Sequence, residues 1–137
     1  MNDNFYILIT GGRSFHDYEE LKNKCNELLI NKRNKNITVV TGTSMGTDEL
    51  ARNYARDNNF NLKIYKTEWE KHGRRAAYVR TRDMQNFIKN QTDSGEIIFW
   101  NGHTKGTEYH IKLAKENNVP LRLYHYNNEP RESSVNQ

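Results

Sequence analysis

Apolar residues along the chain gather in short blocks, and the stretches between the blocks carry apolar residues at helical spacing. Blocks such as "FYILIT" and "EIIFW" are continuous and rich in β-formers, which is typical of strands buried on both faces of a parallel sheet. After the first block, Leu21, Cys25 and Leu28 recur on one helical face. The pattern predicts strands at 5–10, 36–41, 62–66, 96–100 and 121–125, and helices from Asp17, from about Thr47, around 80–90 and near 107–117.

Strands that alternate with helices predict an α/β fold with right-handed crossovers. We expect a Rossmann-like three-layer domain, with an about five-stranded parallel sheet in the order 3-2-1-4-5 and helices on both faces. In this order the sheet reverses direction between the first and fourth strands. Residues 1–125 are expected to form this single domain, and residues 126–137 a polar C-terminal tail.

Composition narrows the function classes. The 137 residues carry 21 basic and 17 acidic side chains, a net charge of +4 that favours anionic ligands but is low for a dedicated nucleic-acid binder. Cys25 is the single cysteine, so no disulfide framework or cysteine zinc site is expected, and its place on an apolar stripe predicts a buried thiol. The histidines show no metal spacing, so we expect no metal site. No cofactor is expected either. Without a signal peptide or an apolar run near 18 residues, we expect a cytoplasmic protein with no membrane partner.

Glycines follow three of the predicted strands. The junctions read "TGGRSF" (10–15), "TGTSMGTDE" (41–49) and "NGHTKGTEY" (101–109), and the last two share the pattern Gly-x-x-x-Gly-Thr-acid. Glycine lets a ligand approach the backbone, and the N–H groups of a helix N-terminus bind anions. Tight strand-to-helix turns also use Gly and Thr without any ligand. Because three such loops converge at the carboxyl edge of the sheet, a ligand site is favoured.

The glycine pattern differs from two well-known nucleotide motifs. It is neither Gly-x-x-x-x-Gly-Lys-Ser/Thr nor Gly-x-Gly-x-x-Gly, so ATP hydrolysis and ordinary dinucleotide dehydrogenation lose their main support. In the basic segment 68–84, Arg80 and Arg82 are expected where a helix begins, and a bound anion would explain positive charge there. Trp69 is either a stacking platform for a base or a cover for the sheet edge.

Four segments carry a family resemblance: "TGGRSF", "TGTSMGTDELARNYA", "EWEKHGRRAAYVRTRDM" and "WNGHTKGTEYHIKLA". In this order they resemble the SLOG superfamily, which includes the LOG phosphoribohydrolases and the DprA single-strand DNA binders, and most of all its small YspA-like branch. The resemblance implies a nucleotide or nucleotide-derived ligand in the predicted pocket. The ligand-binding residues expected from the loops and the resemblance are Gly11, Gly12, Arg13, Ser14, Gly42, Thr43, Gly46, Thr47, Asp48, Arg80, Asn101, Gly102, Gly106, Thr107 and Glu108.

The sequence departs from the LOG hydrolase signature, Pro-Gly-Gly-x-Gly-Thr-x-x-Glu. Asn101-Gly102-His103 replaces its start, and His110 stands where the glutamate is expected. Glu108 lies two helical positions away, about 200° around the axis, so it cannot take that role by alignment. The catalytic residues stay open, with Asp48, Glu108 and His110 as candidates.

We therefore expect a domain that binds a nucleotide-derived small molecule, for example a signalling nucleotide such as an ADP-ribose or cyclic species. A phosphoribohydrolase or N-glycosidase acting on nucleoside monophosphates is the first alternative. Single-stranded nucleic-acid binding is the second, and the modest charge argues against it. SLOG relatives are often oligomers, which implies a homodimer or a higher homo-oligomer.

Overall fold

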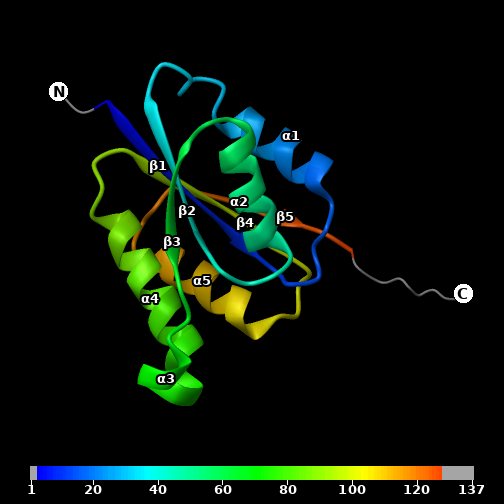
Figure 1. The fold of residues 1–137 in the computed structure, drawn as a ribbon, viewed down its shortest axis with the longest axis vertical. Coiled ribbons are helices and arrows are strands. Elements are labelled where there is room, and N and C mark those ends of the chain that lie inside the picture. The colour runs from blue at the N-terminus through cyan, green and yellow to red at the C-terminus, as the bar shows by residue number, and fades with distance from the viewer. Residues whose placement is uncertain (1–2, 128–137) are drawn as a thin grey trace, which may run out of the picture.

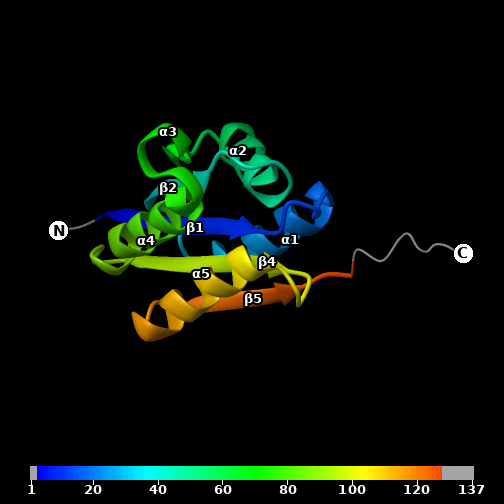
Figure 2. The same ribbon diagram turned by 90° about the horizontal axis from the view of Figure 1, so that it is seen from below.

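The computed structural model describes residues 3–127, which form a five-stranded parallel sheet in the order β3-β2-β1-β4-β5 with helices on both faces (Figures 1 and 2). The strands are β1 (Asn4–Gly11), β2 (Asn36–Gly42), β3 (Asn61–Tyr65), β4 (Ser94–Trp100) and β5 (Leu121–His125). The helices are α1 (Tyr18–Leu28), α2 (Thr47–Asp57), α3 (Trp69–His72), α4 (Ala76–Lys89) and α5 (Lys105–Glu116), with a short 3-10 turn, η1 (Gly73–Arg75). The predicted fold class and strand order are confirmed.

The polar tail predicted at 126–137 lies mostly outside the described part of the chain, which ends two residues after β5. Tyr126 continues the edge of the sheet, because its N–H donates to the carbonyl oxygen of Trp100 at 3.0 Å. At the start of α1, the Asp17 carboxylate accepts a hydrogen bond from the Glu20 N–H at 3.1 Å. This N-cap is the one that the Asp17 and Glu20 spacing predicts.

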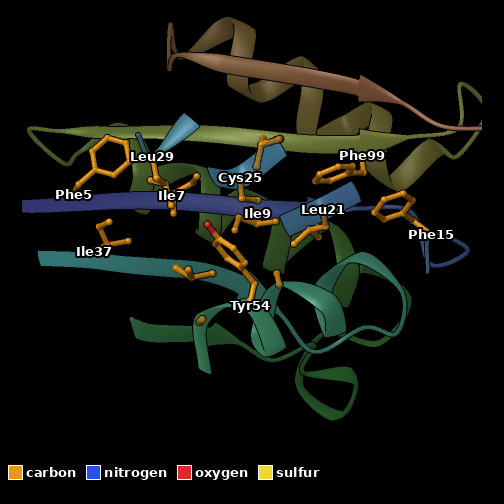
Figure 3. Packing of buried hydrophobic residues seen from close by; sticks show 14 residues of the cluster. Phe5, Ile7, Ile9, Phe15, Leu21, Cys25, Leu29, Ile37, Tyr54 and Phe99 are labelled. Atoms are coloured by element: carbon orange, nitrogen blue, oxygen red, sulfur yellow. The ribbon is translucent and has the colours of Figure 1, made fainter. Parts of the chain in front are cut away.

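The larger apolar core lies between the sheet and α1 and α2 (Figure 3). Ile7, Ile9, Leu21 and Tyr54 are fully or almost fully buried there. Cys25 is fully buried in the same cluster, as predicted, and burial raises the pKa of its thiol. A smaller cluster on the other face holds Leu8, Val40, Met84, Ile88 and Val119 against α4. Burial on both faces explains why the strands read as continuous apolar blocks.

The segment between β3 and α4 is more structured than the sequence indicates, because it folds into α3 and η1. As a result α4 begins at Ala76, so Arg80 and Arg82 lie beyond its first turn. The expectation that these arginines stand at the start of a helix is wrong, and the dipole argument for a bound anion falls with it. No helix within residues 3–127 is long and apolar enough to cross a membrane.

Gly11 lies at the end of β1, where the main chain passes very close to β4. A Cβ on Gly11 would overlap the carbonyl group of Phe99, whose oxygen accepts the Gly12 N–H at 2.9 Å. We predict that Gly11→Ala lowers the free energy of unfolding by about 2–3 kcal/mol, because the clash is with backbone. Gly95→Ala is the control, since a Cβ there would meet its nearest atoms at 3.7 Å. Chemical denaturation should show a change within about 1 kcal/mol for the control, and equal losses in the two variants would contradict the close approach.

Candidate functional site

A cavity of about 310 Å³ opens at the carboxyl edge of the sheet, beside the end of β1 and the first turns of α4 and α5. This is the place where the strand order reverses between β1 and β4, which is where open α/β sheets hold their ligands. The lining residues are Thr10, Gly11, Arg13, Ser44, Thr67, Trp69, Ala77, Tyr78, Arg80, Thr81, Thr104, Gly106, Thr107 and His110.

The cavity brings together only some of the residues expected at the site. The expected ligand-binding residues that line it are Gly11, Arg13, Arg80, Gly106 and Thr107, together with the catalytic candidate His110. The expected residues that do not line it are Gly12, Ser14, Gly42, Thr43, Gly46, Thr47, Asp48, Asn101, Gly102 and Glu108. Lining residues that the sequence did not indicate include Thr10, Ser44, Tyr78, Thr81 and Thr104. Nothing in the sequence marks these hydroxyl groups, because Ser and Thr are common at turns and caps.

A buried ion pair joins α2 to α4 beside the cavity. Nη1 of Arg80 lies 3.6 Å from Oδ2 of Asp48, and the two side chains are 10% and 1% exposed. The Thr10 hydroxyl donates to Oδ1 of Asp48 at 2.8 Å, and the Ser44 N–H donates to Oδ2 at 3.3 Å. Burial raises the pKa of Asp48, and the Arg80 charge and the Thr10 hydroxyl oppose that rise. Asp48 therefore does not line the cavity itself but holds Arg80, which does.

Protein acceptors satisfy only some of the hydrogen-bond donors of the Arg80 guanidinium. Nη1 donates to the Ser44 hydroxyl at 3.3 Å, but the buried Nε has no hydrogen-bond partner. A buried donor without a partner costs about 1–3 kcal/mol, and more when it is charged. Since Arg80 also lines the cavity, an anion bound there would meet a guanidinium that is already held in place by Asp48.

The two copies of the Gly-x-x-x-Gly-Thr-acid pattern serve different purposes. In the first copy, a Cβ on Gly42 would lie 2.5 Å from Nη1 of Arg80, and Gly46 has a φ of 74° and packs against the backbone of Arg13. The Thr47 hydroxyl donates to the carbonyl oxygen of Gly12 at 2.8 Å, so it too is used inside the protein. In the second copy, a Cβ on Gly106 would meet nothing within 4 Å. Only the second copy offers open space at the cavity.

The C-terminal segment covers the outer side of the first glycine loop. A Cβ on Gly12 would overlap the hydroxyl of Tyr126, which also lies 2.9 Å from the Ser14 hydroxyl. The Tyr126 ring packs on Phe15 with 4.9 Å between ring centroids. Gly12 therefore makes room for a side chain of the protein.

A buried polar chain runs from the cavity into the sheet. His110 lines the cavity and lies 3.2 Å from the Thr81 hydroxyl through Nε2 and 3.1 Å from Nε2 of Gln85 through Nδ1. Nε2 of Gln85 also donates to Oε1 of Glu96 at 2.9 Å. Burial, aided by the Arg80 charge, lowers the pKa of His110 to about 3, and burial raises the pKa of Glu96 to about 7 against the effect of the Gln85 hydrogen bond.

Gln85 and Glu96 are candidate functional residues that the sequence motifs do not indicate. Glu96 belongs to the apolar block "EIIFW". An acidic residue within a buried strand is unusual, and this could have marked Glu96 as a functional candidate.

Two exposed aromatic side chains line the cavity. Trp69 on α3 is 60% exposed, and Tyr78 on α4 is 51% exposed. The Tyr78 ring meets Tyr109 edge-on, with 5.3 Å between centroids. Of the two roles considered for Trp69, this position suits stacking against a ligand, because the side chain leaves most of its surface open.

The three catalytic candidates do not come together around one reacting position. Asp48 is buried behind the cavity, and His110 is neutral with both ring nitrogens within hydrogen-bonding distance of neighbours. Glu108 is exposed outside the cavity and pairs with Lys105 at 3.7 Å. Among residues 3–127, no group of three or more His, Cys, Asp or Glu side chains is placed to hold a metal ion.

Comparisons with known proteins agree with this architecture. The model of the YspA, cpYpsA-related SLOG family matches residues 5–72, from β1 to the end of α3. The chain therefore belongs to the SLOG superfamily and to its YspA-like branch, as its sequence resemblance predicts. Gene 61 protein of Mycobacterium phage D29 is 26% identical over 120 residues, which cover 84% of this chain and 92% of the phage protein.

Among solved structures, LpCGTa in complex with UDP has a similar fold, with a TM-score of 0.53 and 14% identity. The match covers 90% of this chain but only 30% of LpCGTa, so the likeness concerns the fold of one part of that protein. A predicted subunit of tRNA methyltransferase from Methanocaldococcus jannaschii DSM matches with a TM-score of 0.38 and 12% identity, over 88% of this chain and 66% of that one.

The raised pKa of Glu96 predicts a pH-dependent cost of stability. The folded protein keeps the Glu96 proton up to about pH 7, whereas the ordinary pKa is 4.5, so the free energy of unfolding falls as pH rises through this window. Glu96→Gln removes the titration. Relative to wild type, its free energy of unfolding should therefore increase by up to about 3 kcal/mol between pH 4.5 and 7.

Urea denaturation at several pH values measures this difference. Glu116→Gln, which removes an exposed acid from α5, is the control and should show no such trend. A pH-independent difference between Glu96→Gln and wild type would contradict the prediction.

Proposed function

We propose that this chain binds a nucleotide or a nucleotide-derived ligand in the cavity at the carboxyl edge of the sheet. The observation that carries the proposal is the Arg80 guanidinium, which lines the cavity, is 10% exposed and has an Nε without a hydrogen-bond partner. An oxyanion such as a phosphate is the natural partner for such a group.

Two further features that attract anions support a phosphate in this cavity. Arg13 lines the cavity from the first glycine loop. The first turn of α5 contributes Gly106 and Thr107, and the N-terminus of a 12-residue helix attracts anions through its unpaired N–H groups and its dipole. Because Gly106 has no Cβ, a phosphate oxygen has room to approach this turn.

The aromatic side chains and the size of the cavity favour a nucleotide over a bare anion. Trp69 and Tyr78 offer apolar rings on which a base can stack. A volume of about 310 Å³ lies at the lower end of the range for small-molecule sites, which suits one mononucleotide-sized group. LpCGTa, part of which has a similar fold, forms a complex with UDP, and this likeness adds support for a nucleotide-related ligand.

We propose binding without assigning turnover. Phosphoribohydrolase activity and single-strand nucleic-acid binding stay predictions, since no arrangement in residues 3–127 favours either one. An oligomeric state, a cytoplasmic location and the identity of the nucleotide likewise stay predictions.

A nucleotide panel tests the proposal. Nucleoside monophosphates, ADP-ribose, NAD and cyclic species are titrated into the protein, and thermal shift and calorimetry report binding. We predict that at least one of them binds and that Arg13→Gln weakens its binding at least about tenfold, because a charge-assisted hydrogen bond contributes roughly 1.5–3 kcal/mol. Arg122→Gln removes the same charge from outside the cavity and should leave the affinity unchanged. Absence of binding across the panel would refute the proposal.

Gly106→Ala separates ligand binding from folding. The added methyl group meets no protein atom within 4 Å, and alanine favours a helix over glycine by about 1 kcal/mol, so stability should hold or rise. The same methyl group occupies the space proposed for the phosphate, so affinity should fall. A variant that binds as tightly as wild type would place the ligand elsewhere.

A further inference from the structure

We propose that Gln85 and Glu96 are positioning residues that set, through His110, whether the Thr81 hydroxyl donates or accepts a hydrogen bond in the cavity. Protonation of Glu96 reverses the direction of this hydrogen-bond chain. The link to ligand binding rests on the proposed function, because it concerns the same cavity, whereas the reversal itself does not depend on any ligand.

The geometry of the chain supports this proposal. It runs from Thr81 to Nε2 of His110 at 3.2 Å, from Nδ1 of His110 to Gln85 at 3.1 Å, and from Gln85 to Glu96 at 2.9 Å. All four side chains are at most 5% exposed, so water does not compete for these contacts. Thr81 and His110 line the cavity at one end of the chain.

With Glu96 charged, each hydrogen in the chain has a fixed place. The two hydrogens on Nε2 of Gln85 point to Oε1 of Glu96 and to Nδ1 of His110. Nδ1 must then accept, so the neutral imidazole carries its proton on Nε2 and donates to the Thr81 oxygen. The hydroxyl hydrogen of Thr81 is left to point into the cavity, where it can donate to an anion.

This state leaves two buried oxygens without partners, Oε1 of Gln85 and Oε2 of Glu96. A charged carboxylate with one unpaired oxygen is costly in a buried position, so uptake of a proton from solvent relieves it. This cost is the cause of the raised pKa of Glu96, which titrates at about 7.

With Glu96 protonated, the chain runs the other way after the Gln85 amide rotates by half a turn. The Gln85 oxygen then takes the place of its nitrogen and accepts from the Glu96 hydroxyl and from a proton on Nδ1 of His110. The Gln85 NH2 group takes the former place of the oxygen, where neither of its hydrogens meets an acceptor among the described residues. Nε2 of His110 in turn accepts from Thr81, which keeps only lone pairs for the cavity. The imidazole stays neutral in both states, because one proton is exchanged between its two nitrogens.

Few charged groups surround the chain. From α5, His110 faces Gln85, and burial together with the Arg80 charge from α4 holds the pKa of His110 low. The residues paired with Glu96 in the sheet are Leu8 of β1 and Leu121 of β5, which are apolar. Among Thr81, His110, Gln85 and Glu96, Glu96 is therefore the group whose protonation state changes near neutral pH.

The imidazole tautomer gives a test that needs no ligand. Nitrogen-15 NMR distinguishes a proton on Nε2 of His110 from one on Nδ1. We expect the Nε2 form at pH 8.5 and the Nδ1 form at pH 5.5 in wild type, with the ring neutral throughout. Glu96→Gln should hold one tautomer across this range, and Glu116→Gln should switch as wild type does. One unchanging tautomer in wild type, or an equal switch in Glu96→Gln, would overturn the proposal.

Sulfate tests the link to the cavity, because it stays a dianion over the whole pH range. Relative to Glu96→Gln, wild type should lose about tenfold in sulfate affinity between pH 8.5 and 5.5, as expected when one hydrogen bond to a charged group is lost. Thr81→Val should abolish this difference. A tautomer switch without sulfate binding would refute the cavity as an anion site and leave the chain reversal standing, whereas sulfate binding without a switch would refute the reversal alone.

Discussion

The buried ion pair between Asp48 and Arg80 holds the carboxyl edge of this domain together. Asp48 lies in the first turn of α2 on one face of the sheet, and Arg80 belongs to α4 on the other. They meet at the end of β2, where Gly42 leaves room for them. Removing one member would leave an uncompensated buried charge, which typically costs 3–5 kcal/mol. The loop between β2 and α2, the N-terminal part of α4 and one wall of the cavity therefore depend on this contact, which holds Arg80 in place before any ligand binds.

The fold could be predicted from the sequence because its physical cause is local. Strands buried on both faces must be apolar along their whole length, and blocks such as "FYILIT" show this directly. The start of α4 could not be predicted, because α3 and η1 bury no side chain and so leave no apolar pattern in residues 69–75. Arg80 was misplaced for the same reason. Its position on the helix is explained by Asp48, a partner that is 32 residues earlier in the chain.

The site was harder to predict than the fold because glycine has two uses that look alike in a sequence. A Cβ on Gly42 would collide with protein atoms, whereas a Cβ on Gly106 would face open space, although both glycines belong to the same repeated pattern. Only the neighbouring atoms distinguish a glycine that admits a side chain from one that admits a ligand. The hydrogen-bond chain that Gln85 and Glu96 form behind His110 could not be predicted for a related reason. Gln85 and Glu96 come from different elements, and their partnership exists only in the folded protein.

The contact of Tyr126 with Ser14 and Phe15 has a practical consequence for how this domain is joined to others. It fixes the chain after β5 beside the first glycine loop, at the same edge of the sheet as the cavity. Asn4 begins β1 at the opposite edge, roughly 25 Å away for a strand of eight residues. The described segment therefore begins at the edge of the sheet opposite the cavity and ends at the cavity edge, which makes the N-terminal side the better place to attach a tag or a fused domain.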